Sequence, residues 1–209
     1  MHYSSKGMRN DPLFMRNGVG KSGIWDIPLI RKQTICLENI DLIASCETKK
    51  NDSSENKKKG VHHFVDDYRF RATYTHPDNC IEKYSQYAFV LTPDFSLYAD
   101  MPLWMQLNNV AQNRWVGSYW QSKGIITIPT VSWSTSKSFS FCFEGIEQGA
   151  TVAISTLGCH NSKINFLKGY NAMLENLVPE TIICYGSVFS HMKGNIIAVE
   201  CHNPKGRRS

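Results

Sequence analysis

Two aspartates that directly follow apolar runs are the residues best suited to carry chemistry. Asp66 follows the run that begins at Val61, and Asp94 follows the run that begins at Ala88. A carboxylate just beyond a buried strand is costly unless it is paired or hydrated, and this cost favours a functional use. Two such carboxylates can share the roles of acid and base. We therefore predict Asp66 and Asp94 as catalytic residues, or as metal ligands if a divalent cation is used as a cofactor.

Polar and aromatic side chains near the other strand ends are suited to hold a ligand. Arg114 lies among aromatic residues and could bind an anion or stack on a base. It could equally be a structural arginine whose aliphatic chain covers the contact between helix and sheet. Ser155 and Gly158 lie in a turn that could present N–H groups to a phosphate. Trp133 and Tyr185 suit a planar nucleobase. The predicted ligand-binding residues are Ser96, Arg114, Trp133, Ser155, Gly158 and Tyr185.

Neighbouring polar residues have structural explanations. Asp100 precedes a helical segment and is expected to be its N-cap. Asp67 is followed by arginines, including Arg69, and is expected to form an ion pair at the strand end. His62 and His63 fall on opposite faces of one strand, where packing is expected rather than metal binding.

Six short apolar runs must position these residues. They are rich in Val, Ile, Phe and Thr and alternate with helical stretches, which predicts an α/β fold with βα units and a mainly parallel sheet of about six strands. The carboxyl ends of such strands form the usual ligand-binding edge, in an open sheet or in an incomplete (β/α) barrel. The runs cover residues 61–67, 88–96, 125–134, 151–158, 181–187 and 195–202.

Three segments between these runs are predicted to be helical. The longest starts after Asp100, has Pro102 in its first turn and ends at Gly124. The other two cover residues 138–146 and 163–178, the latter ending before Pro179. Residues 37–45 show partly helical spacing.

The division of the chain follows from composition. Residues 1–46 are expected to be an N-terminal lead-in packed on the domain, 47–60 an exposed charged loop, 61–203 the α/β core domain and 204–209 a basic tail. A length of 209 residues suits one domain.

Charge and cysteine content narrow the partners and the compartment. The net charge of +5 comes from two basic segments, so nucleic-acid binding through Lys57, Lys58, Lys59 and the tail stays open without being required. No apolar run reaches membrane-spanning length, which predicts no membrane partner. Seven cysteines without paired spacing, and no secretion signal, favour a reducing, cytoplasmic location.

Seven segments together resemble the DUF4417 family, a group of uncharacterised proteins of bacteria, phages and other mobile elements. The resemblance runs from about Gly60 to Val199. It implies no established reaction, and it places recurring polar positions of the family at residues of the predicted site. The segments are D66DYRF, L91TPDFSLYADMPLWMQ, N113RWVGSYWQ, I128PTVSWS, F139SFCFEGI, V152AISTLG and I182ICYG.

The hypothesis from sequence is a phage-type or mobile-element enzyme acting on a nucleotide or another phosphate-bearing substrate at the carboxyl edge of the strands. Two alternatives stay open. One is a non-catalytic protein that binds a nucleotide or a host protein in the same pocket. The other is a DNA-binding replication or regulatory factor.

Overall fold

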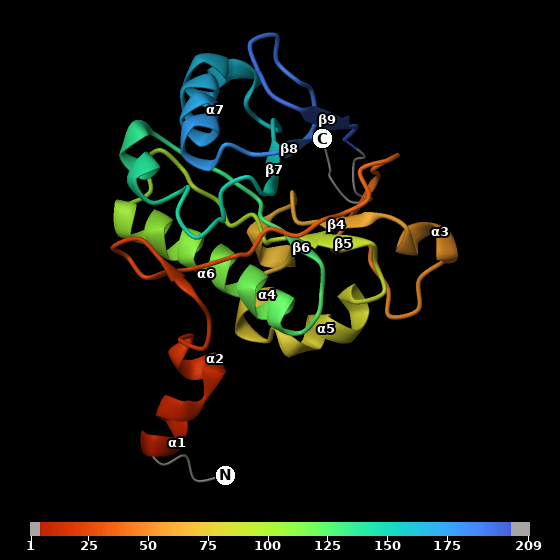
Figure 1. Cartoon of the computed structure of the whole chain (residues 1–209), viewed down its shortest axis with the longest axis vertical. Helices are drawn as coiled ribbons and strands as arrows, with labels where there is room; N and C mark the ends of the chain where they lie inside the picture. The colour runs from red at the N-terminus through yellow and green to blue at the C-terminus, as the bar shows by residue number, and fades with distance from the viewer. Residues whose placement is uncertain (1–4, 202–209) are drawn as a thin grey trace.

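Two parallel β-sheets carry the core in the computed structural model, which describes residues 5–201 (Figure 1). Neighbouring strands within each of these sheets are parallel and follow one another in chain order. A short antiparallel pair, β1 (Lys21–Ser22) and β2 (Ile27–Pro28), precedes them. The larger sheet contains β3 (Leu42–Ala44), β4 (Gly60–His62), β5 (Phe89–Leu91) and β6 (Thr127–Ile128), and the smaller contains β7 (Thr151–Ser155), β8 (Thr181–Tyr185) and β9 (Ile196–Val199).

One parallel bridge, between Thr130 and Ala153, joins the two sheets. The N–H of Val131 donates to the carbonyl of Ala153 at 2.8 Å, and the N–H of Ala153 donates to the carbonyl of Pro129 at 2.9 Å. Pro129 faces β7 through its carbonyl and has no N–H to donate to that strand, which limits the ladder between the two sheets. The predicted mainly parallel α/β fold is confirmed, but the single sheet of about six strands is replaced by two linked sheets. The strand ladders of residues 5–201 do not show a barrel.

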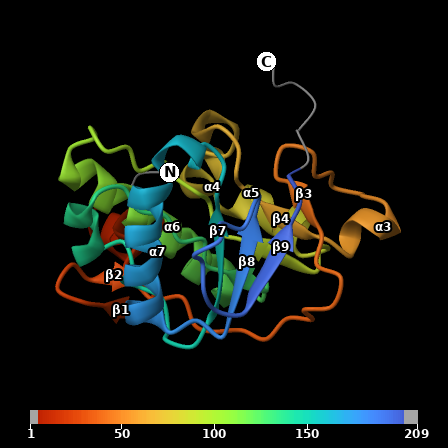
Figure 2. The same ribbon diagram turned by 90° about the horizontal axis from the view of Figure 1, so that it is seen from above.

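The two longest helices cover the sheets. The second half of α6 (Leu103–Ser122) is buried on nearly all sides, since it lies between the larger sheet and β2. A Cβ at Gly117 would come within 2.6 Å of Ile30 and Thr92 side-chain atoms, so only glycine permits this approach. The other helix, α7 (Lys163–Leu177), packs beside β7 and β8 (Figure 2).

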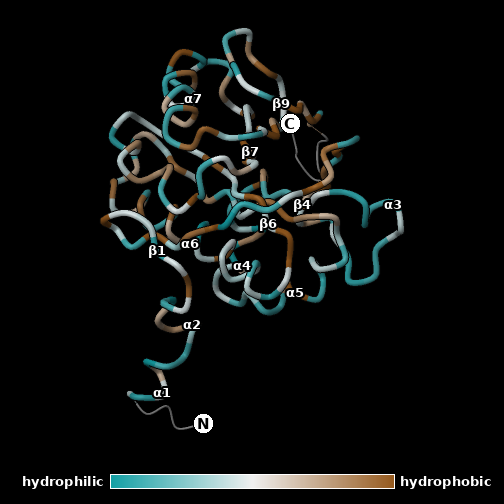
Figure 3. The backbone as a smooth tube through the Cα atoms, viewed as in Figure 1, coloured by the Kyte–Doolittle hydropathy of each residue, from teal (hydrophilic) through white to brown (hydrophobic). Residues whose placement is uncertain are grey.

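The shorter elements lie around this frame. Figure 3 shows the chain around α3 (Ser54–Lys57) as hydrophilic, and the Ser53 side chain caps this helical turn. Gly60 is already buried in β4. The short helices are α1 (Ser5–Asn10), α2 (Pro12–Met15), α3 (Ser54–Lys57), α4 (Ala72–Thr75) and α5 (Asp78–Tyr84), with 3₁₀ turns at Asp67–Arg69, Ser136–Ser140 and His160–Ser162.

Three local predictions need correction. Asp100 is not the N-cap of α6, because Pro102 occupies that position and no side chain caps the helix. Residues 138–146 form a 3₁₀ turn followed by further turns, and the left-handed φ of +74° at Gly145 is incompatible with a helix. The partly helical spacing of residues 37–45 hides β3, a strand of only three residues.

A buried polar network fastens α6 to the ends of β5 and β6. The Asn113 side chain donates to the Pro93 carbonyl at 2.7 Å and accepts from the Thr92 hydroxyl at 3.0 Å. The Thr130 N–H donates to the Thr92 hydroxyl at 2.8 Å, and the Thr130 hydroxyl donates to the Thr92 carbonyl at 2.9 Å. Both strand ends are therefore held against the same turn of one helix.

Arg114 completes this network, with 2% of its surface exposed. Its guanidinium donates to the carbonyls of Glu144, Thr130 and Cys142 at 3.0, 3.0 and 2.8 Å, and also to the Asn113 side chain. Burial lowers the pKa of Arg114 to about 10, which leaves it charged at neutral pH. Arg114 thus joins α6, the end of β6 and the turns after residue 140.

Replacing Arg114 by methionine should destabilise the protein by about 2–5 kcal/mol, because buried carbonyls lose their donors. Urea unfolding monitored by circular dichroism measures this difference. Arg31→Met is the control: this arginine is exposed and should tolerate the change within about 0.5 kcal/mol. Equal stabilities of the two variants would contradict the structural role of Arg114.

Candidate functional site

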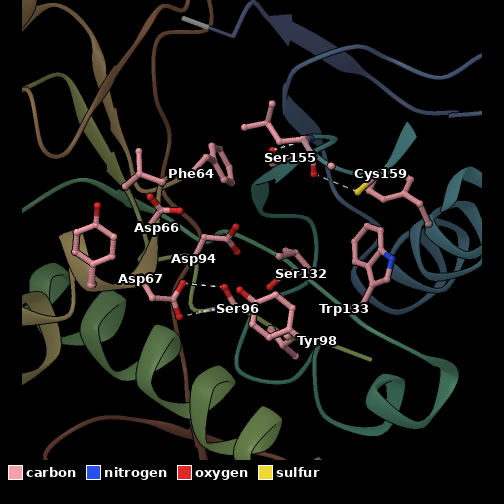
Figure 4. A pocket seen from close by; sticks show the side chains of 17 residues that line it. Phe64, Asp66, Asp67, Asp94, Ser96, Tyr98, Ser132, Trp133, Ser155 and Cys159 are labelled. Atoms are coloured by element: carbon pink, nitrogen blue, oxygen red, sulfur yellow. Dashed lines mark hydrogen bonds between the residues drawn. The ribbon is translucent and has the colours of Figure 1, made fainter. Parts of the chain in front are cut away.

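A cavity of about 840 Å³ opens at the carboxyl ends of β4, β5, β6 and β7 (Figure 4). The chain segments that leave these four strands form most of its wall, and α7 contributes Phe166. Six of the eight predicted site residues line it: Asp66, Asp94, Ser96, Trp133, Ser155 and Gly158. The other two, Arg114 and Tyr185, do not belong to its lining.

Asp94 lies among the polar side chains of the cavity, between Asp66, Ser132 and Ser96 in Figure 4. Its Oδ1 is fully buried and has no hydrogen-bond partner among the described residues. Burial raises the pKa of Asp94 to about 7, with a further increase from the negative charge of Asp67. A hydrogen bond with the Ser132 side chain and the positive charge of Arg114 act in the opposite direction. Near neutral pH this carboxyl group therefore exists in both protonation states.

The buried network described above fixes the position of Asp94. Asn113 holds the carbonyl of Pro93, the residue immediately before Asp94. Thr130, two residues before Ser132, is held by Thr92 and by Arg114. Arg114 therefore acts behind the cavity, as an anchor of the backbone, and four of its five guanidinium N–H donors bind protein acceptors.

Asp67 is a site residue that the sequence analysis assigned differently. It was expected to pair with an arginine, but its carboxylate accepts hydrogen bonds from the Ser96 hydroxyl at 2.8 Å and the Ser96 N–H at 3.2 Å. The arginine contact belongs to its neighbour instead, since Asp66 lies 3.8 Å from Arg69. Asp67 thereby ties the segment after β4 to the segment after β5.

The Ser155 hydroxyl group forms hydrogen bonds within the turn after β7 and with the neighbouring strand. Ser155 Oγ donates to the Tyr185 carbonyl at 3.4 Å and accepts from the Leu157 N–H at 3.1 Å. Gly158 adopts a left-handed φ of +73°, which glycine accommodates without strain. Ser155 therefore lines the cavity while stabilising the turn, and the cavity lining in the described residues contains no lysine, arginine or histidine.

Aromatic rings form two facing walls of the cavity. On one side, Trp133 packs against Phe166 with ring centroids 5.0 Å apart, and its indole lies against Gly169, where a Cβ would come within 2.2 Å of the ring. On the other side, Phe64 stacks on Tyr185 with centroids 5.2 Å apart and an interplanar angle of 14°. Tyr185 thus supports the wall from behind and is 2% exposed.

The rim of the cavity is also aromatic. Tyr68 and Tyr98 are 74% and 61% exposed at its mouth. A partly buried thiol, Cys159, lies on the opposite side from Asp66 in Figure 4, and burial followed by the charge of Asp94 raises its pKa. Sequence reasoning missed these residues, although Tyr68 and Tyr98 follow the aspartates of the predicted site by two and four positions.

The remaining expectations concern metals, membranes and nucleic acids. Within residues 5–201, no group of three or more histidine, cysteine, aspartate or glutamate residues is arranged to hold a metal ion, so Asp66 and Asp94 have no third such ligand there. No described helix is long and apolar enough to cross a membrane.

The lysines proposed for nucleic-acid binding are partly committed to carboxylates. Lys59 lies 2.7 Å from Asp41, and Lys58 lies 3.5 Å from Glu55. The basic tail, residues 204–209, lies outside the described residues. The nucleic-acid hypothesis therefore stays a prediction from sequence.

Comparison with known proteins places the chain in a family. Its residues 19–202 match the family model described as "Domain of unknown function (DUF4417)". Two relatives named "Gene 1 protein" are each 36% identical: that of Mycobacterium phage L5 over 90% of this chain and 82% of its own length, and that of Mycobacterium phage D29 over 88% and 69%. No solved structure matches the chain. The resemblance found in the sequence is confirmed, and the protein belongs to the DUF4417 family, with phage relatives.

Proposed function

We propose that the cavity binds a nucleobase-containing small molecule and that Asp94 exchanges a proton with it, as the general acid–base of an enzyme. The observation that carries this proposal is the Asp94 carboxyl group, whose Oδ1 is buried in the cavity wall without a hydrogen-bond partner. An unsatisfied buried carboxyl oxygen destabilises the protein, and a ligand that donates to it would recover the cost.

The shape of the cavity supports a planar ligand. Trp133 and Phe166 form one wall and Phe64 forms another, with the carboxyl group of Asp94 between them in Figure 4. Rings of this kind stack on a base without selecting its identity, while a few polar groups set its orientation. A volume of about 840 Å³ is sufficient for a nucleoside.

The negative charge of the cavity argues against a phosphate group bound inside it, which was one part of the hypothesis from sequence. Asp66, Asp67 and Asp94 line it, and no described lysine, arginine or histidine does. A phosphate inside would face carboxylates without a compensating cation, which costs free energy at short range. We therefore assign the cavity to the base, and a phosphate group would have to extend toward the solvent.

The protonation state of Asp94 suits acid–base chemistry. A group with a pKa of about 7 can both give and take a proton near neutral pH, which is the condition for efficient general acid–base catalysis. The Ser132 side chain lowers the pKa of this carboxyl group, and Oδ1 has no hydrogen-bond partner among residues 5–201. A protein that only binds the base would use the same contacts, and turnover distinguishes the two.

Asp94→Asn should abolish turnover and weaken binding of a nucleoside or nucleobase at least tenfold, because the variant keeps the shape of the side chain but cannot exchange a proton. A panel of nucleobases, nucleosides and nucleotides is screened by thermal shift, and products are followed by chromatography. Asp100→Asn is the control, since Asp100 is exposed and lies outside the cavity lining. If Asp94→Asn binds the ligand as tightly as the wild type does, this role of Asp94 is rejected. If the wild type binds a ligand without converting it to a product, the protein is a non-catalytic binder.

The pKa of Asp94 also predicts how stability depends on pH. Its folded value of about 7 exceeds the ordinary value of 3.8, so the folded protein binds more protons than the unfolded chain between these values. The contribution of Asp94 to stability is therefore largest at low pH and is lost as pH rises from about 4 to 7. Relative to wild type, Asp94→Asn should gain stability over this range, by at most about 1.4 kcal/mol per pH unit. Parallel urea titrations at several pH values measure the difference, and a pH-independent difference would contradict the raised pKa.

A further inference from the structure

The hydrogen-bonding groups around Asp94 restrict which base the cavity accepts. Two of the three serines that line the cavity use their hydroxyl hydrogen within the protein. Ser96 donates to Asp67 at 2.8 Å and Ser155 donates to the Tyr185 carbonyl at 3.4 Å, while the Ser132 side chain lowers the pKa of Asp94. The strongest polar groups left for a ligand beside Asp94 are therefore carboxylate oxygens, which accept hydrogen bonds.

Two carboxyl groups present these acceptors. Asp94 contributes its carboxyl group, whose Oδ1 has no hydrogen-bond partner in the described part of the chain, and its neighbour in Figure 4 is Asp66. Asp66 is exposed at the rim, and its contact with Arg69 at 3.8 Å is too long for a strong hydrogen bond. A ligand edge that carries two N–H donors is complementary to this pair, whereas an edge with a ring nitrogen acceptor would face a carboxylate oxygen.

Nucleobases differ in this respect. Guanine carries adjacent N–H donors at N1 and at the 2-amino group, while adenine and cytosine place a ring nitrogen acceptor beside their amino group. Inosine keeps the N1 donor and lacks the 2-amino group. The cost of an unmatched polar edge in a buried site is large enough to separate these bases by one to three orders of magnitude.

We propose that the cavity is selective for a guanine-type base, whose paired N–H donors bind the carboxylate oxygens of Asp94 and Asp66. This inference rests on the proposed function, since it names the substrate class of the same site. A donor edge stabilises the ionised form of Asp94, so binding at neutral pH should release a proton from it. A base that presents an acceptor would bind the carboxylic acid form and take up a proton instead.

The test is isothermal titration calorimetry of the full-length protein with guanosine, inosine, adenosine and cytidine at pH 7. Each titration is run in two buffers of different ionisation enthalpy, because the difference gives the number and sign of protons exchanged. We expect guanosine to bind at least tenfold more tightly than inosine and to release protons, with no measurable binding of adenosine or cytidine. Asp94→Asn should lose both the affinity for guanosine and the proton release.

The variant Asp66→Asn tests the contribution of Asp66 to binding separately from that of Asp94. It should reduce the affinity for guanosine about tenfold and leave that for inosine nearly unchanged, while Asp100→Asn, an exposed aspartate outside the cavity, should change neither. Binding of adenosine or cytidine as tight as that of guanosine, or proton uptake on binding guanosine, would overturn the guanine assignment and leave the proposed function in place. Failure of all four nucleosides to bind would overturn both.

Discussion

The buried guanidinium of Arg114 is the interaction on which the rest of this structure depends. Within residues 5–201 the two parallel sheets share one bridge, between Thr130 and Ala153, and Pro129 has no N–H to extend it. Arg114 compensates for this weak connection, since it binds the end of β6 and the turns after residue 140 from one position on α6. A buried charge is tolerable only when nearly all its donors are satisfied, so these backbone segments have little freedom to move apart.

The same network explains why the site contains one constrained carboxyl group and one exposed one. Asp94 follows a backbone segment that Asn113 holds, and its charge experiences the positive charge of Arg114 through the low-dielectric interior. That attraction does not fully offset burial, and the raised pKa is the result. Asp66 is exposed and near Arg69. Asp94 and Asp66 both follow a strand, but they differ in burial because the buried network holds the backbone before Asp94 and, in the described part of the chain, forms no hydrogen bond with the backbone before Asp66.

Sequence reasoning placed most of the predicted residues around one cavity because the carboxyl ends of parallel strands must meet at one edge. That rule placed Asp94, Ser96, Trp133 and Ser155 together without any knowledge of their contacts. It failed for Arg114 and Tyr185, whose side chains point behind the cavity. Residues 182–185 are apolar or aromatic without alternation, so the pattern of this run does not tell which of them face the cavity. Arg114 lies in the second half of α6, which is buried on nearly all sides, so helical periodicity no longer separates a core face from a solvent face.

Other features could not be read from the sequence because they depend on tertiary contacts. A strand as short as β3 gives no clear alternation, and it forms because β4 offers a parallel partner. In residues 138–146, Phe139, Phe141 and Phe143 recur at every second position, which does not support the predicted helix. The segment turns where Arg114 binds the Cys142 and Glu144 carbonyls. Asp67 was assigned to an arginine because charge pairs are the simplest inference along a sequence. In the fold, the Ser96 N–H and hydroxyl lie closer, and two hydrogen bonds to one carboxylate outweigh an exposed ion pair.

The electrostatic character of the cavity also follows from the position of Arg114, which lies behind the cavity and not in its lining. The positive charge of Arg114 holds the backbone behind the cavity, and the groups that line the cavity are carboxylates, serine hydroxyls and aromatic rings. On this basis we propose a planar ligand rich in N–H donors in preference to an anionic one. Moving Arg114 toward the cavity would leave the carbonyls of Thr130, Cys142 and Glu144 without donors, so the fold itself prevents this arginine from becoming an anion-binding residue.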